Sequence, residues 1–219
     1  MPHALPDCIA IDGPAASGKS TVGSAIARKF GYLFLDTGLM YRAVTLAALR
    51  GQIAATSSRI PKLLATLNLR VEATSEGTSV YLGPEDVTAR LKDPEVEANV
   101  SAYAAVPAIR EAMVAEQRRI ASEGRAVLAG RDIGTVVLPH APLKLYLDAS
   151  EDARARRRGV QATQHTRDAR KDIANRDVTD STRSVSPLRP AEDAIVIDTT
   201  QMSLEEVLQL ALEKVSCAN

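Results

Sequence analysis

The chain has 219 residues, of which 45% are hydrophobic, and it carries 27 Lys and Arg residues against 27 Asp and Glu residues. This length allows one domain with a full core, and the balanced charge excludes the broad basic field that holds a nucleic acid polymer or an anionic membrane. No apolar run reaches the roughly 20 residues of a membrane span, and no charged leader with an apolar segment opens the chain, so we expect a cytoplasmic monomer.

Five short apolar runs along the chain predict buried β-strands. They are "CIAID" (8–12), "YLFLD" (32–36), "AVLAG" (126–130), "LKLYLD" (143–148) and "AIVID" (194–198). Each run is followed by a helical pattern or by a polar loop, which is the order of a crossover α/β fold. We therefore predict an α/β protein with a five-stranded parallel sheet.

A glycine-rich motif, "GPAASGKS" (13–20), follows the first predicted strand and opens a helix, as the pattern G-x-x-x-x-G-K-[ST] requires. Such a loop turns backbone N–H groups around phosphate oxygens, and the helix N-terminus adds its positive end. Lys19 would reach the terminal phosphates and Ser20 would ligate Mg²⁺. The predicted ATP-binding residues of this loop are Gly13, Pro14, Ala15, Ala16, Ser17, Gly18, Lys19, Ser20 and Thr21.

The second predicted strand leads into "DTGLMYR" (36–42), at the start of an otherwise apolar helical pattern. An arginine on so apolar a helix needs an anionic partner or a route to water, so Arg42 is a candidate anion-binding residue.

Residues 60–91 interrupt the alternation of strands and helices. "LRVEAT", the turn "SEGT" and "SVYLG" predict a β-hairpin, which we interpret as an inserted subdomain. The following segments, "PEVEANVSAYAAV" and "PAIREAMVAEQRRIASEG", predict two helices that each begin with a proline. Near the end of the chain, Ser203 and Glu206 predict a capping box on the last helix.

Arginines are more numerous than the binding of one nucleotide requires. Nine lie between Arg154 and Arg189, and others stand at Arg42, Arg110 and Arg131. Phosphoryl transfer between two nucleotides needs such cations, because two polyanions must be held in line while charge develops on the transferred group. The N-K-x-D motif of a GTPase is missing from the sequence.

Several motifs together resemble one kinase family. "DTGLMYR" resembles the acceptor-phosphate element of nucleoside monophosphate kinases, and "AGRDIGTVVLP" (129–139) stands where the adenylate type carries a "DGFPR" segment. The further matches are "NVSAYAAVPAIREAM" (99–113), "DASEDARARRR" (148–158), "NRDVTDSTRSVSPL" (175–188) and the hairpin insertion. Over nearly its whole length the chain resembles the bacterial cytidylate kinases, P-loop proteins of the nucleoside monophosphate kinase superfamily.

The resemblance implies a P-loop NTPase fold with a helical lid and an NMP-binding subdomain that contains the hairpin. Residues 1–219 would form one domain, with a core at about 5–59, 92–154 and 171–219, an insertion at about 60–91 and a lid at about 155–170. It also implies a (d)CMP kinase, which transfers the γ-phosphoryl group of ATP to CMP or dCMP and gives CDP or dCDP and ADP. Mg²⁺ would assist this transfer. No general base is needed, because a phosphate monoester with a second pKa of about 6 is already largely dianionic at neutral pH.

The resemblance also assigns roles to individual residues. Lys19, Arg131 and Arg176 would be catalytic. The acceptor's α-phosphate would be held by Arg42, Arg131 and Arg176, its base by Ser101, Arg110, Asp132 and Arg183, and its sugar by Asp180. The acceptor loop would add Asp36, Thr37, Gly38 and Tyr41 to the substrate-binding residues. Near the lid, ATP would be covered by Arg154, Arg157 and Arg158.

Other interpretations of these residues remain open at the level of sequence. The arginines between Arg154 and Arg158 could form a solvated helix face, Asp132 could cap a helix or pair with Arg131, and Ser101 could be a tolerated small residue. A P-loop kinase that acts on a hydroxyl acceptor would need a base and fewer arginines. A nucleotide-sensing module, with the hairpin as its partner surface, would bind nucleotide without turnover.

Overall fold

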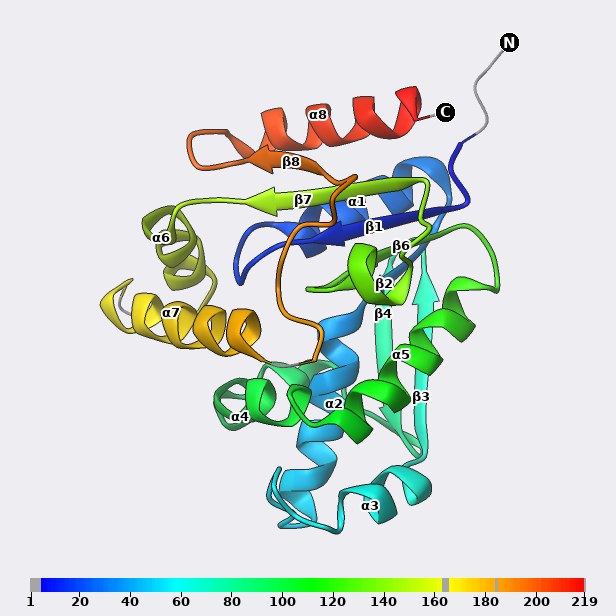
Figure 1. The fold of residues 1–219 in the computed structure, drawn as a ribbon, viewed down its shortest axis with the longest axis vertical. Helices are drawn as coiled ribbons and strands as arrows, with labels where there is room; N and C mark the ends of the chain where they lie inside the picture. Colours follow the sequence, from blue (N-terminus) through cyan, green and yellow to red (C-terminus); the bar gives the residue numbers. More distant parts are fainter. Residues whose placement is uncertain (1–4, 163–165, 184, 219) are drawn as a thin grey trace.

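The computed structural model describes residues 5–162, 166–183 and 185–218 (Figure 1). Five parallel strands form its centre, in the spatial order β2-β6-β1-β7-β8. They are β1 (Cys8–Asp12), β2 (Leu33–Asp36), β6 (Ala126–Ala129), β7 (Leu143–Asp148) and β8 (Ile195–Asp198). Each lies where an apolar run predicts a strand, and the mixed α/β fold with a mainly parallel sheet is confirmed.

The sheet continues beyond these strands into the insertion. Three further strands, β3 (Leu69–Thr74), β4 (Gly77–Leu82) and β5 (Glu85–Asp86), extend it to eight in antiparallel pairing. The predicted count of five strands is therefore not confirmed. The physical reason is that the predicted hairpin joins the free edge of β2, where the Thr78 hydroxyl donates to the Phe34 carbonyl at 2.8 Å and accepts from the Asp36 N–H at 2.9 Å.

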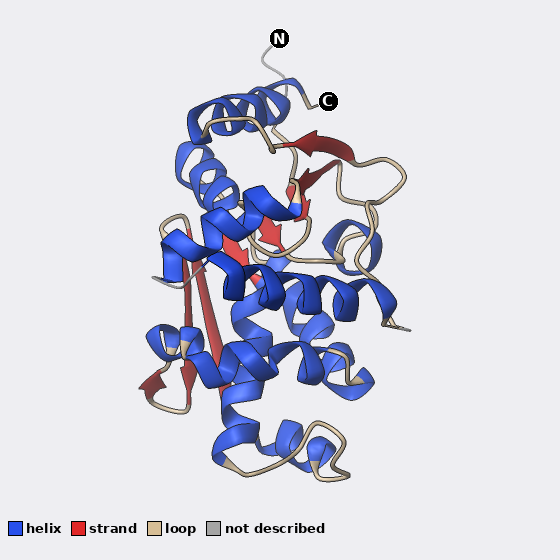
Figure 2. Cartoon of the chain, turned by 90° about the vertical axis from the view of Figure 1, so that its left-hand side faces the viewer, coloured by secondary structure: helices blue, strands red, loops and turns tan. Residues whose placement is uncertain are grey.

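Helices cover both faces of the sheet (Figure 2). On one face α1 (Lys19–Phe30) and α8 (Leu204–Cys217) pack with Ile9 and Ile11, and on the other α2 (Thr37–Arg50) and α5 (Pro107–Ala121) pack with Ala10. This division follows from the strand itself, since successive side chains point to opposite faces. The capping box of Ser203 and Glu206 at the start of α8 is confirmed.

The remaining helices lie toward the carboxyl ends of the parallel strands and around the insertion (Figure 1). They are α3 (Ile60–Thr66), the 3₁₀ turn η1 (Thr88–Lys92), α4 (Pro94–Ala104), the π-helical turn η2 (Ile133–Val137), α6 (Glu151–Ala162) and α7 (Thr166–Thr182). Both α4 and α5 begin with a proline, as predicted. The proposed lid at 155–170 spans most of α6 and the start of α7, and its residues 163–165 lie outside the described part of the chain.

A helix that crosses a membrane has to be both long and apolar. In the part of the chain that the structure describes, none is both long and apolar enough to cross a membrane.

Candidate functional site

The loop between β1 and α1 has the backbone that its sequence predicts. Ala16 and Gly18 adopt left-handed conformations, with φ of 58° and 98°, so successive N–H groups turn inward. A Cβ on Gly13 would lie 2.1 Å from the Leu147 carbonyl oxygen, so only glycine fits this close approach to β7. The Lys19 side chain is buried and folds over the loop, where its Nζ donates to the Pro14 carbonyl at 2.6 Å. Burial lowers the pKa of Lys19 well below its ordinary value.

The acceptor loop at the end of β2 is tied to the P-loop. The Ser20 hydroxyl donates to Asp36 Oδ2 at 2.7 Å, and Asp36 Oδ1 accepts the Gly38 N–H at 3.1 Å as the N-cap of α2. The Thr37 hydroxyl donates to the Ala129 carbonyl at 2.8 Å, which connects the loop to the end of β6. Ser20, Asp36 and Thr37 are thus fixed at the carboxyl ends of the parallel strands, where open α/β sheets bind ligands.

Three arginines from three helices converge on Glu97 of α4. Arg42 of α2 binds Oε1 through Nη2 and through Nε at 3.1 Å, while Arg158 of α6 and Arg176 of α7 bind Oε2 at 2.6 and 2.8 Å. We call these four residues the Glu97 cluster. Burial alone would raise the pKa of Glu97, but the three guanidinium charges together hold that pKa below its ordinary value.

Sequence reasoning did not name Glu97. Its only signal is its position on the predicted helix one turn before Ser101, a spacing that places both residues on the same face. Arg131, which was predicted to hold the acceptor's phosphate together with Arg42 and Arg176, is not part of this cluster. Its Nε donates to Asp180 at 2.8 Å.

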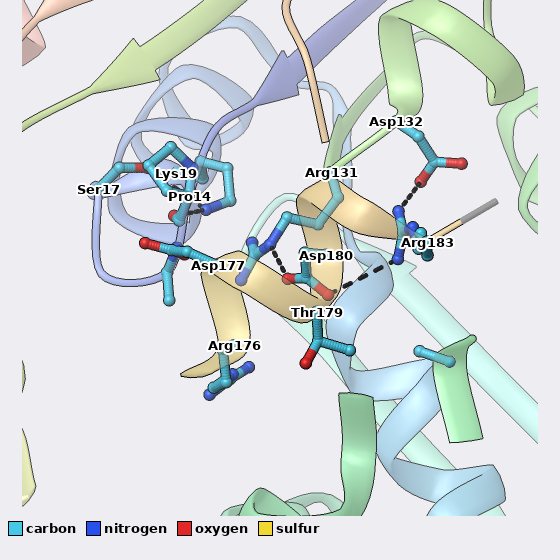
Figure 3. Close-up of polar contacts among 12 residues, drawn as sticks. Pro14, Ser17, Lys19, Arg131, Asp132, Arg176, Asp177, Thr179, Asp180 and Arg183 are labelled. Atoms are coloured by element: carbon cyan, nitrogen blue, oxygen red, sulfur yellow. Dashed lines mark hydrogen bonds and ion pairs between the residues drawn. The ribbon is translucent and has the colours of Figure 1, made fainter. Parts of the chain in front are cut away.

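That pair begins a chain of alternating charges (Figure 3). Arg183 lies between two carboxylates. Its Nη1 is 3.7 Å from Asp180 Oδ1, and its Nη2 is 3.8 Å from Asp132 Oδ1. Asp132 in turn binds Arg110 Nη2, and Arg110 lies over the ring of Tyr41. Three of the four predicted base readers are therefore brought together, whereas Ser101 on α4 takes no part in this chain.

Several donors at this site are buried and lack a hydrogen-bond partner among the described residues. They are the Tyr41 hydroxyl, Arg110 Nε, Arg176 Nε and Arg183 Nη2. A buried donor without a partner costs free energy, so each is expected to have a use. Burial, and next to it the like charges of Arg42 and Arg131, lower the pKa of Arg176 to about 10.

The predicted lid arginines divide into different environments. Arg154 Nη1 lies 3.2 Å from the Ala15 carbonyl of the P-loop and 2.5 Å from Asp177 of α7. Asp177 also accepts the Ala15 N–H at 3.4 Å. Arg157 instead donates to the hydroxyl and carbonyl of Thr199, after β8, so the structure does not bring it to the P-loop.

One buried carboxylate, Asp12 at the end of β1, was also missed by sequence reasoning. It accepts the N–H groups of Ile133 and Gly134 at 2.8 and 2.7 Å, which anchors the turn after Asp132 to the strand before the P-loop. Burial raises its pKa to about 6, against the opposite effect of these two hydrogen bonds. Its mark in the sequence is that it is the one acidic residue of an otherwise apolar predicted strand, at its last position.

Comparisons with known proteins agree over almost the whole chain. A profile of the family described as cytidylate kinase matches residues 9–217. The cytidylate kinase of Streptococcus thermophilus (strain CNRZ 1066) is 47% identical over 217 residues, which cover 94% of each chain. That of Shouchella clausii (strain KSM-K16) is 46% identical over 213 residues, with 94% of this chain and 95% of that one covered. A gluconokinase structure from Sinorhizobium meliloti 1021 shares the fold, with a TM-score of 0.51 at 17% identity and coverage of 98% of this chain and 94% of that one.

The raised pKa of Asp12 predicts a pH-dependent stability. The folded state binds the proton of the Asp12 carboxyl more tightly than the unfolded state does. Protonated Asp12 therefore contributes fully to the free energy of unfolding below about pH 4, and this contribution is lost as the pH rises through about 6. The free energy of unfolding of the wild type, minus that of Asp12→Asn, should therefore fall by up to about 3 kcal/mol between about pH 4 and pH 7. Urea unfolding of both proteins at each pH measures it, and a constant difference would contradict the assignment.

Proposed function

The chain belongs to the cytidylate kinase family and phosphorylates CMP or dCMP with ATP, and we propose that it aligns the two substrates with arginines and without a general base. The observation that carries this mechanism is the placement of two groups of arginines, the Glu97 cluster and the chain from Arg131 to Arg110, beside one P-loop. A dianionic phosphate monoester is a nucleophile as it binds, so the protein has to supply position and positive charge.

On the donor side, the P-loop would hold the phosphates of ATP. The Lys19 ammonium group donates to the carbonyl of Pro14 in the loop and lies 3.3 Å from the Ser17 hydroxyl. Phosphate oxygens that enter the loop would replace these oxygens as its acceptors. Arg154 and Asp177 already contact Ala15 of the loop. We assign Arg154 to the triphosphate on this ground, with α6 and α7 as the elements that close over it.

The residues at the mouth of the P-loop fit Mg²⁺, which such kinases generally use with ATP. The hydroxyl of Ser20 and the carboxylate of Asp36 are hard oxygen ligands 2.7 Å apart, and Mg²⁺ is held by one or two such groups together with phosphate oxygens and water. When bound, the ion would neutralise charge on the phosphates of ATP. Asp36, as the cap of α2, would keep these oxygens in place.

On the acceptor side, Arg42 and Arg176 would bind the phosphate of CMP, with Arg131 beside them. Arg176 Nε is buried and has no hydrogen-bond partner among the described residues, which supports this assignment. Closure of α6 and α7 would exclude water, which would otherwise compete with CMP for the γ-phosphoryl group.

The base would lie against the chain of charges. Cytosine offers an amino donor next to two acceptors, ring N3 and O2. Asp132 would accept from the amino group. Arg110 Nε and Arg183 Nη2, which have no hydrogen-bond partner among the described residues, would donate to the two acceptors. Ser101 and Asp180 complete the proposed contacts with the base and the sugar.

We extend the proposal to the organisation of the domain. Residues 60–91 would form the acceptor-side insertion and residues 155–170 the lid, around a core at about 5–59, 92–154 and 171–219. The insertion contacts the acceptor loop directly through Thr78, which supports its placement on that side. The proposed working form is a monomer in the cytoplasm.

An acceptor panel tests the proposed function. With ATP and Mg²⁺, CMP and dCMP should be phosphorylated with far higher kcat/KM than AMP, GMP or a sugar, because a purine in a slot sized for one ring leaves buried polar groups unpaired. Coupled ADP release measures each acceptor. Equal use of AMP and CMP would contradict the proposed base site.

The donor site is tested by Lys19→Ala. A charge aimed at the transferred group contributes about 3 to 5 kcal/mol to the transition state, so kcat should fall by about 10² to 10⁴ with the fold intact. Lys29→Ala is the matched control, since Lys29 is an exposed lysine on the same helix. Circular dichroism checks folding, and near-normal turnover of the Lys19 variant would overturn the P-loop assignment.

The base site is tested by Asp132→Asn. Uracil presents a carbonyl where cytosine has its amino group, and each mismatched hydrogen bond costs about 1 to 3 kcal/mol. The amide of asparagine can donate to that carbonyl, so the ratio of kcat/KM for CMP to that for UMP should fall at least about tenfold, with KM for ATP nearly unchanged. A variant that keeps the full preference for CMP would show that Asp132 does not read the base.

A further inference from the structure

The Glu97 cluster has the geometry of an occupied anion site. Guanidinium groups from α2, α6 and α7 meet at the two oxygens of one carboxylate, with Arg158 and Arg176 sharing Oε2 at 2.6 and 2.8 Å. Arg42 binds the other oxygen through two of its nitrogens. Three charged groups from three separate helices are thus oriented by a single anion, which is the arrangement that recognition of a phosphate requires.

The cluster also carries more positive charge than Glu97 can balance. Its three arginines and one glutamate leave a formal charge of +2. Arg176 Nε is buried and has no hydrogen-bond partner among the described residues. A ligand with two negative charges and several acceptor oxygens would satisfy both conditions.

We propose that the Glu97 carboxylate competes with the phosphate of CMP for the acceptor-phosphate subsite and is displaced when CMP binds. The inference rests on the proposed function, because Arg42 and Arg176 are the residues assigned there to the acceptor phosphate. A carboxylate oxygen and a phosphate oxygen accept from the same N–H groups, and two anions at such short range repel each other strongly where water is largely excluded. One anion therefore replaces the other.

The exchange makes Glu97 a residue that determines acceptor specificity. An acceptor must bring a phosphate to release the carboxylate, so a nucleoside without one leaves Glu97 in place. Release also frees Arg158 and Arg176, and hence α6 and α7, from their ion pairs with α4. Arg42 and Arg176 are then available to the phosphate of CMP.

Glu97→Gln tests the proposal, because it removes the competing charge and keeps the size of the side chain. The Kd for CMP, measured by isothermal titration calorimetry, should fall about tenfold, which corresponds to about 1.4 kcal/mol. The Kd for ATP and the inhibition constant of cytidine, which has no phosphate, should stay within about twofold of the wild type. Glu95→Gln is the matched control, since Glu95 is an exposed glutamate in the first turn of the same helix.

A weaker or unchanged affinity of Glu97→Gln for CMP would overturn the inference, because Glu97 would then arrange the arginines and would not compete with the phosphate. If the variant melts too low for calorimetry, thermal melting with and without CMP replaces it. CMP should then raise the melting temperature of Glu97→Gln more than that of the wild type. Failure of the proposed acceptor site is a separate outcome, since the wild type would then use AMP as well as CMP in the acceptor panel.

Discussion

The binding site is held together by arginines that are balanced by carboxylates of the chain itself. Without these partners, so many guanidinium groups at one end of a sheet would repel one another and would favour unfolding. The pairs are Arg42, Arg158 and Arg176 with Glu97, Arg131 with Asp180, Arg110 with Asp132 and Arg154 with Asp177. The phosphate of CMP would enter by exchange with one of these partners, Glu97.

Local patterns in the sequence predicted the parts of the fold that depend on local physics. The buried strands follow from apolar runs, the start of α8 from a capping box, and the P-loop from its glycines and lysine. The size of the sheet did not follow, because pairing between Phe34 and Thr74 joins segments that are 40 positions apart and leaves no mark on either one. A hairpin that closes on itself and one that extends a sheet have the same local pattern.

The sequence identified the arginines of the candidate site but not their acidic partners. The arginines stood out, since so many cations need anions, and the family resemblance supplied their roles. Their partners did not stand out: Glu97 lies 55 residues from Arg42 and 79 from Arg176 in the sequence, on a helix whose other glutamate, Glu95, is exposed. Asp12 and Asp177 were missed for the same reason. An acidic residue that pairs across the fold is indistinguishable in sequence from one that faces water.

Helix α7 contacts three parts of the site through positions within two turns. Arg176 belongs to the Glu97 cluster, Asp177 accepts from the P-loop at Ala15, and Asp180 pairs with Arg131. A helix is stiff over this length, so a ligand that shifts one of these contacts moves the other two with it. If ATP and CMP each shift this helix, the binding of one nucleotide changes the affinity for the other. Thermodynamic linkage then makes the effect of ATP on CMP affinity equal to that of CMP on ATP affinity.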